Sequence, residues 1–145
     1  MMKIQIINGA NLNLLGTREP YIYGNQSFET FFEQLKIQYS SIELYYFQSN
    51  NEADIIEKIH QVQQYDGLII NGGAYSHTSI AIADALRSVA VPHIVEVHIS
   101  NVFNREDFRK KSYIAQACSG SICGLGLDGY RLAIEHIIHC CCANK

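Results

Sequence analysis

The segment from residue 8 to residue 24 carries side chains that could move protons. It follows an apolar run and reads Asn8-Gly9-Ala10-Asn11-Leu12-Asn13-Leu14-Leu15-Gly16-Thr17-Arg18-Glu19-Pro20-Tyr21-Ile22-Tyr23-Gly24. A loop of this length inside a compact domain is usually either functional or disordered, and its paired leucines argue against disorder. A guanidinium close to a phenol is the raw material of an acid–base site, because a nearby cation favours tyrosinate. Composition alone leaves open a plainer interpretation, a surface loop with an Arg18–Glu19 ion pair.

A carboxylate and an imidazole lie two positions apart in the apolar run His93–Ile99. Alternate residues of a strand face the same way, so Glu96 and His98 are expected side by side. A carboxylate fixes the tautomer of a neighbouring imidazole and favours its charged form, which makes His98 a candidate general acid. The alternative is a histidine that only completes a polar patch. Ser100 and Asn101 follow, and their hydroxyl, amide and backbone N–H groups could hold a carboxylate.

Further polar side chains follow the apolar run Gly67–Asn71. The sequence continues as Gly72-Gly73-Ala74-Tyr75-Ser76-His77-Thr78-Ser79. This pattern indicates a glycine turn into a capped helix, whose free N–H groups attract anions, although an ordinary strand-to-helix turn explains it too. His77 would lie beside any ligand bound there. Arg105 and Arg109 have i, i+4 spacing and are expected on one helical face, either solvated or reaching substrate oxygens.

The apolar pattern predicts the elements that must position these residues. Five apolar runs are typical of strands: Lys3–Asn8, Ile42–Phe47, Gly67–Asn71, His93–Ile99 and Ser119–Gly124. Four segments have helical periodicity: Ser27–Tyr39, Asn51–Tyr65, Ser79–Val89 and Tyr130–Cys142. Strands that alternate with helices and are apolar on both faces predict a parallel sheet covered on both sides. Right-handed crossovers make this a doubly wound α/β fold with a five-stranded, flavodoxin-like sheet, and we expect a single catalytic domain over residues 1–145.

This fold predicts where ligands bind, namely beyond the carboxyl ends of the strands and near a topological switch point. The unusual polar side chains follow the first, third and fourth predicted strands. The resulting constellation is Asn11, Arg18, Glu19, Tyr23, Asn71, His77, His98, Ser100 and Arg109. The sequence contains no recognisable Ser or Cys triad, metal cage or dinucleotide fingerprint. The constellation suits proton transfer on a small, oxygen-rich anion.

Length and charge exclude several classes of protein. The chain has 145 residues, of which 48% are hydrophobic, and a formal net charge of −3. Phosphate binding needs clustered Lys and Arg, so nucleic acid is a poor candidate partner. No apolar run approaches the length of a membrane span, and the residues before the first strand are too few for a signal peptide. We therefore expect a cytoplasmic enzyme with no membrane partner.

Five cysteines complete the composition, three of them adjacent near the end of the chain: Cys118, Cys123, Cys140, Cys141 and Cys142. His136 and His139 lie near the adjacent trio, but the spacing matches no standard zinc pattern. We expect no metal and no cofactor. A helix end in a reducing compartment accounts for the thiols.

Taken together, the motifs resemble the type II 3-dehydroquinate dehydratases. The matching pieces span the chain in family order: Asn8 to Gly16, Arg18-Glu19-Pro20 with Tyr23-Gly24, Gly73 to Ser79, Glu96 to Asn101, and Ile122 to Gly126 with Gly129-Tyr130. The resemblance implies a shikimate-pathway hydro-lyase of aromatic amino acid and chorismate biosynthesis. Such an enzyme removes water from 3-dehydroquinate by anti elimination through an enolate and yields 3-dehydroshikimate.

The resemblance also implies catalytic roles for five residues. Tyr23, as tyrosinate, takes the proton beside the ketone, and Arg18 stabilises the tyrosinate. Asn11 helps to hold the water that stabilises the enolate. His98 donates a proton to the departing hydroxyl, and Glu96 orients His98.

Substrate binding and assembly follow from the same resemblance. The residues implied to bind the substrate are Asn71, His77, Ile99, Ser100 and Arg109. Asp84 is implied to reach the site from a neighbouring subunit, because the family forms dodecamers built from trimers, and the helix around it is apolar on nearly every side. Residues 13–24 are implied to form a lid. Two departures stand out, Ala10 and Gly72, where the family usually has Pro; they put the rigidity of the loops in doubt, not the reaction.

Three other functions share the predicted fold. A flavin-binding electron carrier needs a hydroxyl-rich phosphate loop after the first strand, where this chain has amides. A phosphoacceptor signalling domain needs acidic residues and a Lys at strand ends that hold Asn8, Asn71 and Gly124. A catalytically inactive module that binds sugar acids or phosphate remains compatible with the sequence.

Overall fold

The computed structural model describes residues 1–17, 21 and 25–143. Its centre is a five-stranded parallel sheet in the order β2-β1-β3-β4-β5. The strands are β1 (Lys3–Asn8), β2 (Glu43–Gln48), β3 (Gly67–Asn71), β4 (His93–His98) and β5 (Gly120–Cys123). The predicted doubly wound α/β fold is confirmed, and the strand bounds differ from prediction by one residue at most at each end.

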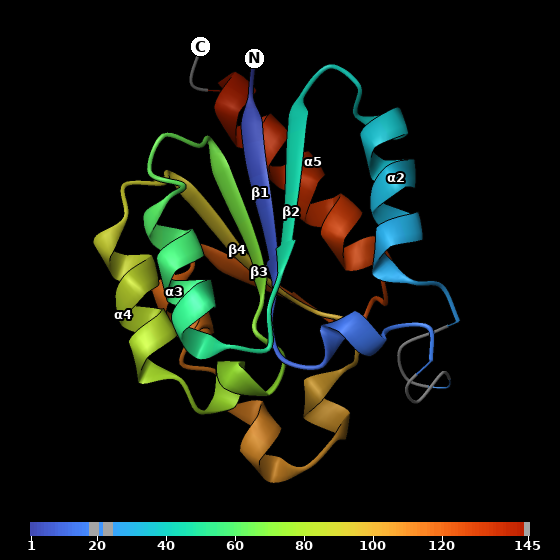
Figure 1. The fold of residues 1–145 in the computed structure, drawn as a ribbon, viewed down its shortest axis with the longest axis vertical. Helices are drawn as coiled ribbons and strands as arrows, with labels where there is room; N and C mark the ends of the chain where they lie inside the picture. Colours follow the sequence, from blue (N-terminus) through green and yellow to red (C-terminus); the bar gives the residue numbers. More distant parts are fainter. Residues whose placement is uncertain (18–20, 22–24, 144–145) are drawn as a thin grey trace.

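Four α-helices cover the sheet, two on each side (Figure 1). They are α2 (Phe28–Gln38), α3 (Glu52–His60), α4 (Ile80–Ser88) and α5 (Asp128–Ala143). Ser27, Asn51 and Ser79 cap the first three, each accepting a hydrogen bond from a backbone N–H of the first turn. The prediction for α3 was too long, because the chain tightens after His60 into turns with i→i+3 bonds, such as Val62 N–H to the Ile59 carbonyl.

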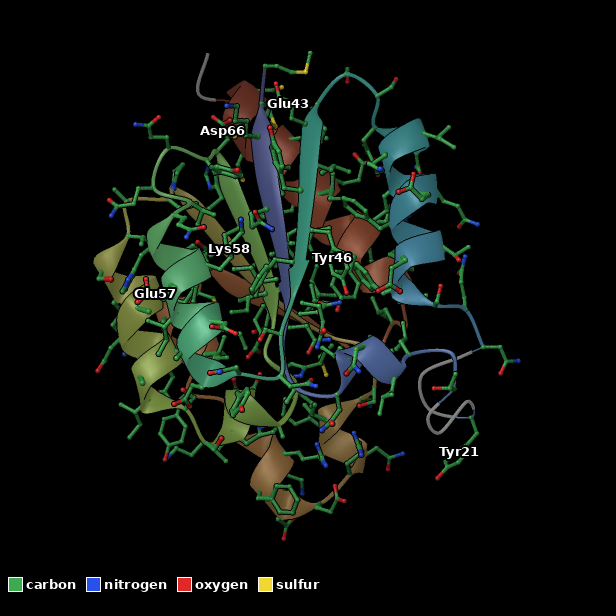
Figure 2. The ribbon with its side chains drawn as sticks, in the orientation of Figure 1. Tyr21, Glu43, Tyr46, Glu57, Lys58 and Asp66 are labelled. Atoms are coloured by element: carbon green, nitrogen blue, oxygen red, sulfur yellow. The ribbon has the colours of Figure 1, made fainter. Side chains whose placement is uncertain are left out.

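The sheet separates two hydrophobic cores. One core joins α2 and α5 to Ile4, Ile6, Ile69, Val95 and Val97. The other joins α3 and α4 to Ile7, Leu68, Ile70 and Ile94. Tyr46 of β2 points toward α2, where its ring stacks on Phe28 with centroids 4.6 Å apart (Figure 2). Because residues alternate along a strand, Glu96 and His98 share the α3–α4 side of β4 with Ile94.

Short 3₁₀ helices gather at the carboxyl ends of the strands, at the bottom of Figure 1. They are η1 (Leu12–Leu14), η2 (Gly73–His77), η3 (Val102–Asn104) and η4 (Asp107–Lys110), with η5 (Ala115–Ala117) before β5. The shared helical face predicted for Arg105 and Arg109 is wrong, because Arg105 is an extended residue between η3 and η4. Both arginines contact Glu106, at 3.9 Å from Arg105 and 2.6 Å from Arg109, and two short turns replace a continuous helix.

Two loops touch at the switch point between β1 and β3, where connections leave the sheet in opposite directions. The Gly9 N–H donates to the Asn71 carbonyl at 2.7 Å. A Cβ on Gly9 would lie 2.3 Å from the Gly72 carbonyl oxygen. Gly73 has φ +60, and a Cβ there would lie 2.7 Å from the Ala10 carbonyl oxygen. Glycine is required for this approach. Within the described part of the chain, no helix is long and apolar enough to cross a membrane.

Candidate active site

A pocket opens at the carboxyl ends of β1, β3 and β4. Seven predicted site residues line it: Asn11, Asn71, His77, His98, Ile99, Ser100 and Arg109. Its other lining residues are Ala10, Leu12, Leu14, Leu15, Gly73, Ala74, Val102 and Arg105. Segments far apart in the sequence therefore converge as the fold predicts, and the pocket combines amides, imidazoles and guanidinium groups.

His98 and Glu96 form a buried imidazole–carboxylate pair. Nε2 of His98 lies 3.0 Å from Oε1 of Glu96, and Glu96 is only 1% exposed. Nε2 has no directed hydrogen bond to any described residue, and the contact becomes an ion pair only when the imidazole is protonated. The sequence prediction that these side chains share one face of β4 is confirmed. Such a pair can supply a proton to a group in the pocket.

Two serine hydroxyls complete the environment of Glu96. Ser121 donates to Oε1 at 2.9 Å, and Ser112 donates to Oε2. Burial raises the pKa of Glu96, but His98 and these two hydroxyls together outweigh burial, so the pKa is lowered. The carboxylate therefore stays ionised in the range where enzymes usually work.

His77 stacks against His98, with ring centroids 5.7 Å apart and planes 19° from parallel. Its Nδ1 lies 2.7 Å from the Lys111 carbonyl oxygen, which can only accept, so Nδ1 carries a proton. Burial lowers the pKa of His77, and the positive charges of His98 and Arg109 act in the same direction. The neutral ring then has an unprotonated Nε2, which can accept a hydrogen bond from a hydroxyl.

Asn71 is held by a buried network behind the pocket. Its Nδ2 donates to the Tyr130 hydroxyl at 2.9 Å, and its Oδ1 accepts from the Gly73 N–H at 3.1 Å. The Tyr130 hydroxyl in turn donates to Asn8 Oδ1 at 2.8 Å. Burial raises the pKa of Tyr130, so it remains a neutral phenol. The network connects α5 to the ends of β1 and β3.

Asn11 takes a left-handed backbone conformation, with φ 68. Asn tolerates this region better than most residues. Its backbone N–H donates to Asn50 Oδ1 at 2.9 Å, which fixes the loop after β1 against the loop after β2. The conformation directs the chain into η1 along one wall of the pocket.

Two arginines contribute positive charge to the pocket. Arg105 Nη1 donates to Ser100 Oγ at 3.3 Å, and Arg109 Nε donates to Glu106 at 2.6 Å. The second contact uses Nε, and Arg109 also lines the pocket. A guanidinium presented in this way suits a carboxylate or another oxygen-rich anion.

The structure does not place five predicted residues in the lining of this pocket, and one of them is Glu96, which lies against His98. Arg18, Glu19 and Tyr23 lie outside the described residues. Asp84 is exposed on α4, 3.4 Å from Arg87, and does not line the pocket within the chain. The helix around Asp84 was expected to be buried on nearly every side. Within the chain only one side of α4 faces the core, and Ile80 is 59% exposed.

Sequence reasoning missed Ser112, Ser121 and Tyr130 as site residues. Ser121 could have been found by aligning the last two predicted strands, because it is the register partner of Glu96. Ser112 lies in an irregular segment, and Tyr130 resembles any other core aromatic. No pattern along the sequence marks Ser112, whereas Tyr130 belongs to the Gly129-Tyr130 motif of the resemblance, to which no role in the site was assigned.

The cysteine tail of α5 has a close contact with a histidine. Cys140 Sγ lies 3.6 Å from His136 Nε2, one helical turn away. Among the described residues, no group of three or more His, Cys, Asp or Glu side chains is arranged to hold a metal ion.

Comparison with known proteins places the chain in a family. The sequence pattern described as "Dehydroquinase class II" matches residues 2–138. The chain is 52% identical over 143 residues to a 3-dehydroquinate dehydratase of Campylobacter jejuni, covering 97% of this chain and 89% of that protein. It is 49% identical over 142 residues to a 3-dehydroquinate dehydratase of Clostridium botulinum, covering 96% of each.

Solved structures agree with the sequence relatives. A type II dehydroquinase from Butyrivibrio crossotus superposes with a TM-score of 0.91 at 47% identity, covering 94% of this chain and 97% of that one. A type II dehydroquinase from Propionibacterium acnes gives a TM-score of 0.89 at 37% identity, covering 94% and 96% of the two chains. Since similarity in sequence and in fold extends over nearly the whole length, the chain belongs to the class II dehydroquinase family.

Proposed function

We propose that the chain is a hydro-lyase that converts 3-dehydroquinate to 3-dehydroshikimate and water, by anti elimination through an enolate. The observation that carries this proposal is the position of His98. It lies in the wall of a pocket with guanidinium groups, and the Glu96 carboxylate lies against its Nε2. An elimination of water needs an acid beside the leaving hydroxyl and a binding site for the substrate's carboxylate.

The elimination needs a base as well as an acid. We assign the base to Tyr23, which as tyrosinate takes the proton beside the ketone, with Arg18 stabilising the phenolate. An unperturbed Tyr has a pKa of about 10, so activity near neutrality needs a decrease of roughly three units, or about 4 kcal/mol. One cation supplies roughly one to three units, so further hydrogen bonds must contribute.

Each remaining group has one task. Asn11 holds the water that stabilises the enolate oxygen, and His98, backed by Glu96, protonates the departing hydroxyl. The residues that bind the substrate are Asn71, His77, Ile99, Ser100 and Arg109, all of which line the pocket. After turnover Tyr23 has gained a proton and His98 has lost one, so the pair must exchange protons with solvent before the next cycle.

The assembly we propose is a cytoplasmic dodecamer built from trimers. Asp84 then completes the site of a neighbouring subunit. Its place on an exposed side of α4, beside the exposed Ile80, supports an interface there. Light scattering is expected to give a dodecamer, and a fully active monomer would contradict both the assembly and the role of Asp84.

The experiment that tests the function is a direct assay. Purified protein mixed with 3-dehydroquinate should produce the ultraviolet band of a conjugated enone. Borohydride added with substrate should neither inactivate the protein nor attach substrate mass to a Lys, because the mechanism forms no Schiff base. Absence of the enone band at high protein concentration would overturn the proposal.

A further inference from the structure

The Glu96 carboxylate is bound on both oxygens by residues outside the predicted catalytic set. Ser121 Oγ donates to Oε1 at 2.9 Å, and Ser112 Oγ donates to Oε2. Oε1 also lies 3.0 Å from His98 Nε2. Two donors on opposite oxygens restrict rotation of the carboxylate, so its plane is fixed relative to the imidazole.

Both hydroxyls are themselves fixed by the fold. Ser121 is the register partner of Glu96 across the β4–β5 ladder, so the two side chains emerge on the same face of the sheet. Ser112 Oγ accepts the Ala115 N–H at 3.0 Å, where the chain enters η5. Because that N–H occupies a lone pair of Ser112, the hydroxyl proton is left for Glu96.

The groups around the pair have other partners or no charge. Burial, followed by the negative charge of Glu96, raises the pKa of Cys118 to about 12, so this thiol stays neutral. Arg109 is bonded to Glu106 at 2.6 Å, and Lys110 to Asp107 at 2.9 Å. Lys111 Nζ lies over the Tyr113 ring, 4.7 Å from its centroid. Among the described residues, the basic side chain in contact with Glu96 is therefore that of His98, and His77 stacks on the His98 ring.

A second pocket reaches the pair and shares His98 and Arg109 with the substrate pocket. Glu96, Ser112 and Ser121 all line it, and Ser121 is exposed. Water in this second pocket would compete for hydrogen bonds to the Glu96 carboxylate. The hydroxyls of Ser112 and Ser121 already donate hydrogen bonds to its two oxygens. The serines therefore lie between solvent and the carboxylate.

We propose that Ser112 and Ser121 are positioning residues, which hold the Glu96 carboxylate against Nε2 of His98 and so maintain the imidazole as the proton donor. This inference rests on the proposed dehydration, in which His98 protonates the leaving hydroxyl. Neither serine touches the substrate pocket, so both act through Glu96.

The first test compares single variants. Ser121→Ala and Ser112→Ala should each lower kcat about three- to tenfold, the effect of losing one hydrogen bond, while KM changes less than twofold. Ser121→Thr keeps the hydroxyl on a side chain that suits a strand and should restore most of kcat. Ser119→Ala is the matched control, because that hydroxyl accepts from the Ile94 N–H, two residues from Ser121.

The second test is a double-mutant cycle. In a Glu96→Gln background, Ser121→Ala should have little further effect on kcat, because the group through which the serine acts is already altered. An equal loss in both backgrounds would overturn the proposal, and so would serine variants with the kcat of the unmodified protein. Failure of Ser121→Thr to exceed Ser121→Ala would also overturn it, since packing would then explain the loss.

A third measurement separates this inference from the proposed function. The Nε2-bound proton of His98 should give a nuclear magnetic resonance signal that shifts in Ser121→Ala and stays in place in Ser119→Ala. Protein that shows these shifts without turning over 3-dehydroquinate would refute the dehydration and keep the positioning role. Turnover with an unmoved His98 signal in Ser121→Ala and Ser112→Ala would refute the positioning role alone.

Discussion

At the scale of single residues, two tyrosines in one loop should differ sharply in importance. Tyr21 is 85% exposed and points away from the body of the protein (Figure 2). Tyr23→Phe removes only the ionisable oxygen, so turnover should fall about 10²–10⁴-fold, the usual effect of losing a general base. Tyr21→Phe should cost little. Steady-state kinetics on both variants checks this, and the reverse order would assign the base to Tyr21.

A second residue-scale prediction concerns pH and Glu96. The pKa of this buried carboxyl is lowered below its ordinary value of 4.5 in the folded protein, so the unfolded chain binds a proton more readily. Its contribution to the free energy of unfolding is complete above about pH 4.5 and is lost as pH falls through the folded-state pKa.

Glu96→Gln cannot titrate and should show a flatter dependence of stability on pH. Denaturant unfolding of both proteins from about pH 7 to about pH 3 measures the difference. If the free energy of unfolding fell equally with pH in both proteins, the pKa of Glu96 would be the same in the folded and unfolded states, which would contradict the prediction. Asp107→Asn, at an exposed side chain in η4, is a suitable control and should leave the curve nearly unchanged.

At the scale of elements, the contact between the loops after β1 and β3 limits which side chains fit. Gly9→Ala places a Cβ 2.3 Å from a backbone oxygen of Gly72, which cannot move without displacing β3. Gly72→Ala meets the side chain of the buried Ile114 at 2.5 Å. Overpacking usually costs about 1–3 kcal/mol, and Gly9→Ala should lie at the upper end or above it.

The control for these variants is Gly120→Ala in β5. No heavy atom outside its chain neighbours lies within 4 Å of a Cβ there, as far as the described residues extend. Its expected effect on the free energy of unfolding is neutral or slightly stabilising, because alanine restricts the unfolded chain. Chemical denaturation should rank Gly9→Ala as the least stable variant, followed by Gly72→Ala and then Gly120→Ala. Equal stabilities of the three variants would contradict this prediction.

The same contact explains one departure from the family. Gly72 has φ −71, which a proline could adopt. However, the Ile114 side chain and the Ser76 hydroxyl occupy the space that a proline ring would need. In this chain the position is therefore packed by neighbouring side chains, and glycine is what allows that packing. The structure offers no comparable account of Ala10.

At the scale of the whole molecule, Tyr130 connects a helix to the two central strands at the site. Tyr130→Phe leaves the Asn8 acceptor and the Asn71 donor without their partner in a buried environment. Stability should decrease by about 1–3 kcal/mol, and KM should rise because the Asn71 side chain keeps only its hydrogen bond from the Gly73 N–H.

Tyr39→Phe provides the matched control for Tyr130→Phe. The Tyr39 hydroxyl donates to Glu135 at 2.6 Å, and Glu135 lies in α5, as Tyr130 does. This contact connects α5 to the end of α2 and does not reach the pocket. This variant should lose stability while kcat and KM stay near those of the unmodified protein. Thermal unfolding and steady-state kinetics on both variants separate the two effects, and an unchanged KM in Tyr130→Phe would remove its role in the site.

Residue order alone was enough to predict the layers of the fold and several side chains of the pocket. Strand and helix periodicities follow directly from residue order, so the sheet, its helices and the shared face of Glu96 and His98 could be predicted. The parallel topology then placed Asn71, His77 and His98 at one edge, because carboxyl ends of parallel strands meet there.

The contacts that hold those side chains arise from tertiary packing and could not be predicted from periodicity along the chain. Ser121 reaches Glu96 through the register of two neighbouring strands, and Ser112 reaches it from an irregular segment. Tyr130 contacts Asn8 across most of the length of the chain. Such contacts depend on three-dimensional packing between elements, which leaves no periodic trace in the sequence. Several side chains of the pocket can thus be predicted along the chain, whereas the contacts that hold them belong to the folded protein.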